Sequence, residues 1–246
     1  HTLNPACTRL LGELTAASDD VVPDLRDSGS SVCAADFDRD GDLDLMVGSR
    51  VIPGQYPVSP VSRLLENQDG KFVDVTKEIA PALLDAGLVT GAVWSDANND
   101  GWIDLLLATE WGPIRYLANE QGKLVEKTDD ADLAGRTGWW NGITARDLDG
   151  DEDMDYVVTN FGLNTKYHTS VEHPVALYYG DFDNSGSKRL IEAEFENDTL
   201  FPIRGKSCST NAMPDLAKKF KTYHEFALAP LADIYTPTCL QEAEKF

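Results

Sequence analysis

Four acidic segments of nine residues recur along this chain, and each lies between two stretches of β-prone or apolar residues. They are 36–44, 96–104, 147–155 and 181–189, and we call them loops one to four. The β-prone residues that precede them are 31–35, 91–95, 142–146 and 175–180. A unit that recurs along a chain is the signature of a repeat architecture, in which each unit packs against its neighbours. The sequence therefore predicts a strand, an acidic loop and a second strand as the repeating unit.

The first two units also share a second half. Residues 65–74 and 117–126 align, and in each an Asn (Asn67, Asn119) is followed three residues later by a Gly, which is typical of a hairpin turn between two strands. Four strands in roughly 50 to 60 residues correspond to one propeller blade. Because the spacing between loops shortens along the chain, we expect the third unit to lack this outer hairpin and residues 161–174 to form an irregular loop.

From this pattern we predict an all-β fold, a β-propeller of which about four blades are present. The blade repeats cover about 30–204, and 42% apolar content over 246 residues suits one propeller domain over 1–246, or a fragment of one. Residues 214–235 have a helical spacing of apolar side chains, so we expect one or two short helices inserted there between strands. Because closure is expected to need more blades than these, the chain is predicted to be part of a larger propeller.

Oxygen-bearing side chains occupy positions 1, 3, 5 and 9 of loops one to three. Ca²⁺ takes roughly six to eight oxygen ligands at about 2.3 to 2.6 Å, and a short loop with carboxylates at alternate positions can wrap one ion. We expect the backbone carbonyl at position 7 to join them, and Gly41 at position 6 permits the positive φ that turns loop one around the ion. The predicted ligands of loop one are Asp36, Asp38, Asp40, Asp42 and Asp44.

Loops two and three repeat this ligand pattern. Their predicted ligands, with position 7 again acting through its carbonyl, are Asp96, Asn98, Asp100, Trp102 and Asp104, and Asp147, Asp149, Asp151, Asp153 and Asp155. Glu152 stands at position 6 of loop three, where glycine is expected, and the strain there costs on the order of 1 kcal/mol. Without a cation, carboxylates this close repel one another. The pattern therefore predicts three calcium sites.

Loop four is degenerate. Its predicted ligands are Asp181, Asp183, Ser185 and the carbonyl of Ser187, but Arg189 stands at position 9 in place of the last carboxylate. We expect Glu192 at position 12 to substitute for it, and otherwise the site is weak or empty. Loop four is thus a fourth candidate for calcium.

Other interpretations explain single loops but not the set. An EF-hand or dockerin loop requires a bidentate acid at position 12 on an exiting helix, whereas Val47, Leu107 and Val158 occupy that position within apolar runs. A solvated acidic turn explains one such loop, but not three aligned copies with the same flanking strands. Magnesium is disfavoured because it seldom binds in an all-protein cage.

The loops and the strands that follow them, such as 43–48, resemble those of the FG-GAP and VCBS repeat family, the integrin α-like propellers. The resemblance spans roughly 30–204 and implies a seven-bladed propeller, Ca²⁺ in the inter-strand loops, export from the cytoplasm, and binding or adhesion rather than catalysis. The chain is also similar to bacterial secreted proteins in which such repeats accompany an ASPIC/UnbV-like module, and to cartilage acidic protein-like proteins. That similarity rests on 160–164, 172–174 and 214–235.

The charge and hydropathy of the chain exclude several partners. With 42 acidic against 21 basic residues, a formal net charge of −21 opposes binding to nucleic acid and to anionic membranes. No stretch approaches the roughly 18 apolar residues of a membrane span, and the first residues lack the features of a signal peptide. We expect a processed or truncated piece of a secreted, periplasmic or cell-surface protein.

The four cysteines, Cys7, Cys33, Cys208 and Cys239, do not have the spacing of a zinc site. Their even number allows two disulfides in an oxidising compartment, although the connectivity stays open. Cys208 with Cys239 is the favoured pair, because the segment between them looks irregular and in need of a covalent link.

Familiar catalytic motifs are absent from the sequence: it has no GxSxG, HExxH, Gly-rich phosphate loop or Cys/His nucleophile pair. We therefore expect not an enzyme but a binding or adhesion module, whose partner is a protein or glycan outside the cytoplasm. Two alternatives stay open. One is a polysaccharide lyase or hydrolase that uses Trp139, Trp140 and His168, for which packing between blades and surface roles are the competing explanations. The other is a structural protein that self-assembles into surface layers or filaments.

Overall fold

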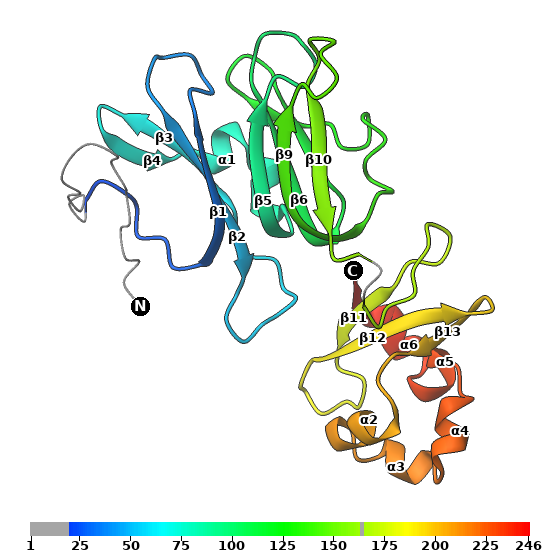
Figure 1. Ribbon diagram of the computed structural model, residues 1–246. Helices are drawn as coiled ribbons and strands as arrows, with labels where there is room; N and C mark the ends of the chain where they lie inside the picture. The colour runs from blue at the N-terminus through cyan, green and yellow to red at the C-terminus, as the bar shows by residue number, and fades with distance from the viewer. Residues whose placement is uncertain (1–19, 163–164) are drawn as a thin grey trace, which may run out of the picture.

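The computed structural model describes residues 20–162 and 165–246, and their strands form three antiparallel sheets (Figure 1). The sheets that follow one another along the chain form a partial β-propeller, as the sequence predicts. Loops one, two and three lie together at the upper end of the blades in Figure 1, while the segment that follows β10 leads down to the fourth unit. None of the helices in the described part of the chain has the length and hydropathy needed to cross a lipid bilayer.

The first blade is a four-stranded meander in the order β1-β2-β3-β4. Its strands are β1 (Ser28–Ala35), β2 (Asp44–Val51), β3 (Arg63–Gln68) and β4 (Lys71–Asp74). The pairing of β1 with β2 ends where Ala35 lies opposite Asp44, so loop one directly connects the last paired residues of the two strands. Strands β3 and β4 form the predicted outer hairpin, whose turn residues Asp69 and Gly70 have positive φ values of 56° and 87°.

The second blade repeats the first, with strands β5 (Leu88–Ser95), β6 (Asp104–Gly112), β7 (Arg115–Asn119) and β8 (Leu124–Glu126). Two short helices that the sequence did not predict, α1 (Thr76–Ile79) and η1 (Pro81–Asp85), connect the blades. A shared core includes the fully buried side chains of Phe37, Met46, Leu64, Leu83, Leu105, Leu107 and Leu117. Because burying each such side chain is worth about 1.5 to 3 kcal/mol, this core holds the two blades together and places loops one and two side by side.

The third unit has only an inner pair of strands, β9 (Gly138–Arg146) and β10 (Asp155–Asn160). The expected irregular loop follows in place of an outer hairpin. Strand β9 also pairs with the far end of β6, where Glu110 lies opposite Trp139, so the second blade and the third unit share one six-stranded sheet. The described residues therefore contain two complete blades and an incomplete third, fewer than the predicted count of about four.

The fourth unit departs most from the prediction, because it is a small α+β body. Its sheet consists of β11 (Ala176–Gly180), β12 (Arg189–Glu196), β13 (Thr199–Pro202) and β14 (Glu244–Lys245). Where one or two helices were expected between strands, the described chain has α2 (Lys206–Ala212), α3 (Leu216–Lys219), α4 (Tyr223–Ala227), α5 (Leu231–Ile234) and α6 (Pro237–Glu242). They pack on the sheet around a separate core that includes Phe182, Ile191, Phe220, Phe226, Leu231 and Tyr235.

The predicted disulfide between Cys208 and Cys239 is not formed, and Cys33 is a free thiol as well. The helical segment is ordered by other means: it has its own apolar core, and Thr222 and Glu225 form a reciprocal capping box at the start of α4. A covalent link is therefore not needed to hold it. Cys7, the remaining cysteine, lies outside the described residues.

Candidate metal centres

Each acidic loop is the turn of an inner hairpin, and all four loops have the same internal hydrogen bonds. The amide at position 6 donates to the carboxylate at position 1: Gly41 to Asp36 at 3.2 Å, Gly101 to Asp96 at 2.8 Å, Glu152 to Asp147 at 3.2 Å and Gly186 to Asp181 at 2.7 Å. The amide at position 5 donates to the side chain at position 3: Asp40 to Asp38, Asp100 to Asn98, Asp151 to Asp149 and Ser185 to Asp183. The amide at position 7 donates to the side chain at position 5: Asp42 to Asp40, Trp102 to Asp100, Asp153 to Asp151 and Ser187 to Ser185. The predicted ligand positions thus fold in the same way in every loop.

The carboxylate at position 9 ties loops one to three to the strands. It accepts the amide at position 2: Phe37 to Asp44 at 3.3 Å, Ala97 to Asp104 at 3.0 Å and Leu148 to Asp155 at 2.9 Å. In the two complete blades, the carboxylate at position 9 also accepts a hydrogen bond from the backbone amide of the hairpin Asn. Asn67 donates to Asp44 at 2.9 Å, and Asn119 donates to Asp104 at 2.7 Å. The two asparagines Asn67 and Asn119 align in the sequence, but this alignment predicts only a hairpin turn and not the hydrogen bond to the carboxylate at position 9.

Two positions in every loop adopt the left-handed backbone conformation. At position 6, φ is 101° at Gly41, 88° at Gly101, 75° at Glu152 and 79° at Gly186. At position 4, φ is 67° at Arg39, 57° at Asn99, 82° at Gly150 and 54° at Asn184. The strain predicted at Glu152 is therefore present, since a glutamate there adopts a conformation that favours glycine. The left-handed position 4 was not predicted, and loop three has its glycine there instead of at position 6.

Loop one concentrates negative charge around a buried oxygen. Carboxylate oxygens of Asp36, Asp38 and Asp44 lie within 4.8 Å of one another. Two charges at that distance repel by about 3 to 4 kcal/mol at an effective dielectric of 20. Oδ1 of Asp36 and Oδ1 of Asp42 are buried without a hydrogen-bond partner among the described residues. A cation is the partner that this arrangement lacks.

The same environment disfavours ionised carboxyl groups when no cation is present. Burial raises the pKa of Asp44 to about 6, against the opposing effect of the amides of Asn67 and Phe37. Burial, and the nearby charge of Asp40, raise the pKa of Asp38 as well. In loop two, burial raises the pKa of Asp104. The two complete blades therefore hold acids that need compensation by positive charge.

Loops two and three differ from loop one in detail. In loop three, oxygens of Asp147, Asp149 and Asp151 lie within 4.8 Å of one another on a more exposed surface. In loop two, position 3 is Asn98, whose side-chain nitrogen donates to Asp100 at 3.0 Å. Loop two is therefore less charged, yet its ligand atoms are still oxygens of three carboxylates and one amide.

Loop four already contains a cation. Arg189 pairs with Asp183 at 3.3 Å, and both side chains are largely buried. The prediction that Glu192 completes this site is wrong, because its carboxylate accepts a hydrogen bond from Tyr167 at 2.7 Å and pairs with Lys166 at 3.1 Å. Its position on β12, beyond Arg189, directs it to those partners instead of to the loop. An internal guanidinium thus stands where the other loops have a fourth acid.

Neighbouring loops contact one another through position 4. The guanidinium of Arg39 in loop one donates to the carbonyl of Gly101 in loop two and lies 4.0 Å from the ring centroid of Trp102. Asn99 of loop two donates to Asp153 of loop three at 2.6 Å. Loop three has Gly150 at this position and no side chain with which to continue the series. The left-handed position 4 thus directs a side chain to the next loop.

The three residues predicted to bind a ligand lie apart from these loops and from one another. Trp139 lines a cavity next to β11, whereas Trp140, the next residue on β9, is not part of the cavity lining and donates to the carbonyl of Arg136. The side chain of His168 is 84% exposed, lies 3.4 Å from Glu194 and does not line the cavity either. Because successive strand residues point to opposite faces, Trp139 and Trp140 cannot form one platform.

The donor set of loops one to three fits Ca²⁺. It consists of carboxylate, amide and carbonyl oxygens, the hard ligands that Ca²⁺ prefers, and the buried Oδ1 of Asp36 has no other partner among the described residues.

Residues 28–51, which include loop one, match the FG-GAP repeat, and residues 96–158, which include loops two and three, match the FG-GAP-like repeat. No curated protein matches the chain.

Proposed function

Because residues 28–51 and 96–158 match FG-GAP repeats, we propose that the chain is a calcium-dependent binding or adhesion module of a protein that acts outside the cytoplasm. FG-GAP repeats occur in extracellular adhesion and binding modules, which supports this class. One observation carries the calcium requirement: carboxylate oxygens of Asp36, Asp38 and Asp44 lie within 4.8 Å of one another, and Oδ1 of Asp36 is buried with no hydrogen-bond partner in the described part of the chain. Leaving such a group unsatisfied costs more than an exposed charge would, so the loop favours a bound cation.

Bound Ca²⁺ would supply the positive charge that offsets repulsion among the acids of each loop. The side-chain oxygens at positions 1, 3, 5 and 9 would hold it together with the carbonyl at position 7. Asp44 and Asp104 already anchor the end of their loops to the outer hairpins through Asn67 and Asn119. Ion binding would therefore stiffen the connection between loop and blade, and the blades would present a fixed surface to a protein or glycan partner.

The calcium proposal predicts a stabilisation that depends on the loop. An ion at about 100 times its Kd stabilises a folded chain by about 2.7 kcal/mol per site, which corresponds to roughly 5 to 10 °C in melting temperature at this chain length. We expect calcium to raise the melting temperature, and elemental analysis of dialysed protein to find bound calcium. Identical melting with calcium and with EDTA, together with no bound alkaline-earth metal, would refute the proposal.

Two substitutions make the test specific. Asp36→Asn keeps the shape of the side chain but removes a charge, so we expect a smaller calcium-induced shift and unchanged or higher stability in EDTA. Asp183→Asn in loop four is the matched control, because its carboxylate pairs with Arg189. We expect it to lower stability by a similar amount with and without calcium. Equal effects of the two variants on the calcium-induced shift would show that the ligand assignment is wrong.

A further inference from the structure

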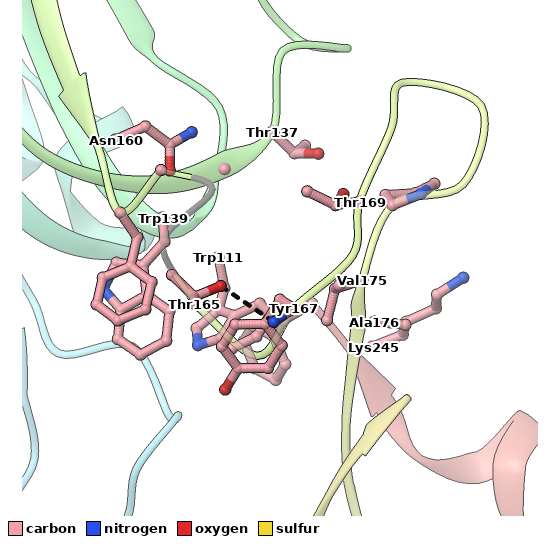
Figure 2. Close-up of a pocket in the computed structure, with 15 residues that line it drawn as sticks. Trp111, Thr137, Trp139, Asn160, Thr165, Tyr167, Thr169, Val175, Ala176 and Lys245 are labelled. Atoms are coloured by element: carbon pink, nitrogen blue, oxygen red, sulfur yellow. Dashed lines mark hydrogen bonds between the residues drawn. The ribbon is translucent and has the colours of Figure 1, made fainter. Parts of the chain in front are cut away.

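A cavity of about 330 Å³ lies between the lower end of β9 and β10 and strand β11, and aromatic rings form one side of it (Figure 2). The rings are those of Trp111, Trp139, Phe161 and Tyr167, and the contacting pairs have centroids 4.7 to 6.5 Å apart. Sites for small ligands typically have volumes of roughly 300 to 1,000 Å³ and are lined mainly by apolar and aromatic side chains. The cavity has the size and the lining of such a site.

Trp111 is held in place by a chain of polar groups behind it. Its indole nitrogen donates to Tyr56 at 2.5 Å, and Tyr56 donates to Glu110 at 2.6 Å. The side chain of Glu110 is only 4% exposed and pairs with Arg50 at 2.7 Å. The backbone of Trp111 has a φ of 60°, a conformation that costs energy for a large residue and persists only where the surroundings enforce it.

Tyr167 is anchored in the same manner on the other side. Its hydroxyl donates to Glu192, and Lys166 and Arg204 pair with the same carboxylate at 3.1 and 3.5 Å. Both rings therefore have their polar ends satisfied away from the cavity, Tyr167 by Glu192 directly and Trp111 through Tyr56, and Glu110 and Glu192 are each paired with cations. Their orientation is fixed before any ligand arrives, which lowers the entropic cost of binding.

Three uncharged polar side chains stand around the cavity without partners. Thr137, Asn160 and Thr169 line it, and their side chains make no hydrogen bond to any described residue (Figure 2). Gly138 allows the amide of Asn160 to come close, since a Cβ at this glycine would lie 2.8 Å from its nitrogen. Hydroxyl and amide groups both donate and accept hydrogen bonds, so they suit a ligand that carries hydroxyl groups.

The charged side chains around the cavity do not favour an ionic ligand. The described lining has no acidic side chain, and its one basic side chain, Lys245, has its ammonium 5.8 Å from the centroid of the Tyr178 ring. An apolar peptide side chain would make no hydrogen bond to these exposed hydroxyl and amide groups, so it would use only the aromatic part of the cavity. A pyranose ring meets both conditions, because its C–H face packs on aromatic rings while its edge presents hydroxyl groups.

We propose that this cavity binds a neutral pyranose unit of a glycan, with Trp139 as a stacking surface and Thr137, Asn160 and Thr169 as hydrogen-bonding groups. This inference rests on the proposed binding function, and it names the glycan as the class of partner. It does not depend on calcium, because the cavity lies away from the acidic loops.

The test uses the full chain with calcium and a panel of methyl pyranosides of glucose, galactose and mannose, their short oligosaccharides, and the corresponding uronic acids. Saturation-transfer NMR and tryptophan fluorescence report binding. We expect Trp139→Ala to weaken binding of the best neutral sugar at least about tenfold, since truncating a central aromatic contact typically has this effect. Tyr223→Ala is the control, because this exposed aromatic side chain lies on α4 and does not line the cavity, and it should leave binding unchanged. Thr137→Val, which keeps the side-chain shape, should weaken it severalfold without lowering the melting temperature.

Several outcomes would overturn the inference: no saturation transfer from any neutral pyranoside, a preference for the uronic acids, or equal losses in Trp139→Ala and Tyr223→Ala. Binding of a hydrophobic dye alone would indicate an apolar protein partner instead. The calcium-induced melting shift separates the two proposals. If the shift persists while no sugar binds, only the cavity assignment fails, and if sugar binds to protein that shows no shift, only the calcium assignment fails.

Discussion

Asn119 links the two complete blades at the point where loops one and two meet, and its removal should destabilise the chain. Its side-chain nitrogen donates to the carbonyl of Phe37 in loop one at 2.8 Å and to that of Ile103 in loop two at 3.0 Å. Its side-chain oxygen accepts the amide of Gly122 at 2.8 Å. The residue is 1% exposed, so water cannot readily replace these bonds in Asn119→Ala.

The size of the effect follows from the groups left unpaired. A buried polar group without a partner costs about 1 to 3 kcal/mol, and two buried carbonyls lose their donor here, so we expect a loss of about 2 to 4 kcal/mol. For a chain of this length, that corresponds to a melting temperature lower by about 5 to 15 °C. The loss should appear in EDTA as well as in calcium, because none of these bonds involves an ion.

Asn67 provides the matched control, since it occupies the same position in the first blade. Its side-chain oxygen accepts the amide of Gly70 at an exposed turn, but its side-chain nitrogen makes no hydrogen bond to a described residue. Asn67→Ala should therefore cost only about 0.5 to 1 kcal/mol. Thermal unfolding followed by circular dichroism compares the two variants with the parent chain. Equal destabilisation would refute the argument that the bonds to Phe37 and Ile103 hold the blades together.

Three further predictions concern single side chains. Glu152→Gly removes the left-handed strain at position 6 of loop three and should raise stability in urea by about 1 kcal/mol or leave it unchanged; a clear loss would contradict the strain. Arg39→Ala removes the contact with Trp102 and should lower stability by about 1 kcal/mol, whereas Arg26→Ala at the exposed surface should leave the melting temperature unchanged. Burial opposes ionisation of Glu192, but the hydrogen bond from Tyr167 and the cations Lys166 and Arg204 outweigh this effect and lower its pKa. Its contribution to stability is therefore fully present above the ordinary pKa of glutamate and is lost as the pH falls through the lowered pKa. Glu192→Gln should therefore flatten the decline of melting temperature on the acid side, and an unchanged profile would count against this.

The loops could be predicted in detail because their constraints are local. The alternating oxygen ligands and the turn at position 6 act within nine residues, and the hydrogen-bond pattern of loop one therefore recurs in all four loops. The left-handed conformation at position 4 was not predicted, because the residue types of Arg39, Asn99 and Asn184 favour it only weakly. The contact that Arg39 makes with loop two depends on how the blades pack, which is a tertiary effect.

The fourth unit and Glu192 show where local reasoning ends. Loop four resembles the others in sequence, yet the strands around it pack against five short helices in the described chain instead of against a third blade. Whether β11 joins a propeller or a separate core depends on apolar contacts with residues more than thirty positions away, such as Phe220 and Leu231. The further similarity to ASPIC/UnbV-associated and cartilage acidic protein-like proteins stays a prediction.

The negative charge of an acidic loop can be compensated in two ways along this chain. Loops one and three each hold three acids whose carboxylate oxygens lie within 4.8 Å of one another, and a bound cation would offset their repulsion. In loop four the guanidinium of Arg189 sits beside Asp183 and supplies that charge from within. A covalently attached cation is present under all conditions, whereas a bound ion follows its concentration. Under the calcium proposal, loops one to three would therefore respond to the calcium concentration, whereas loop four would keep its charge compensation at any calcium concentration.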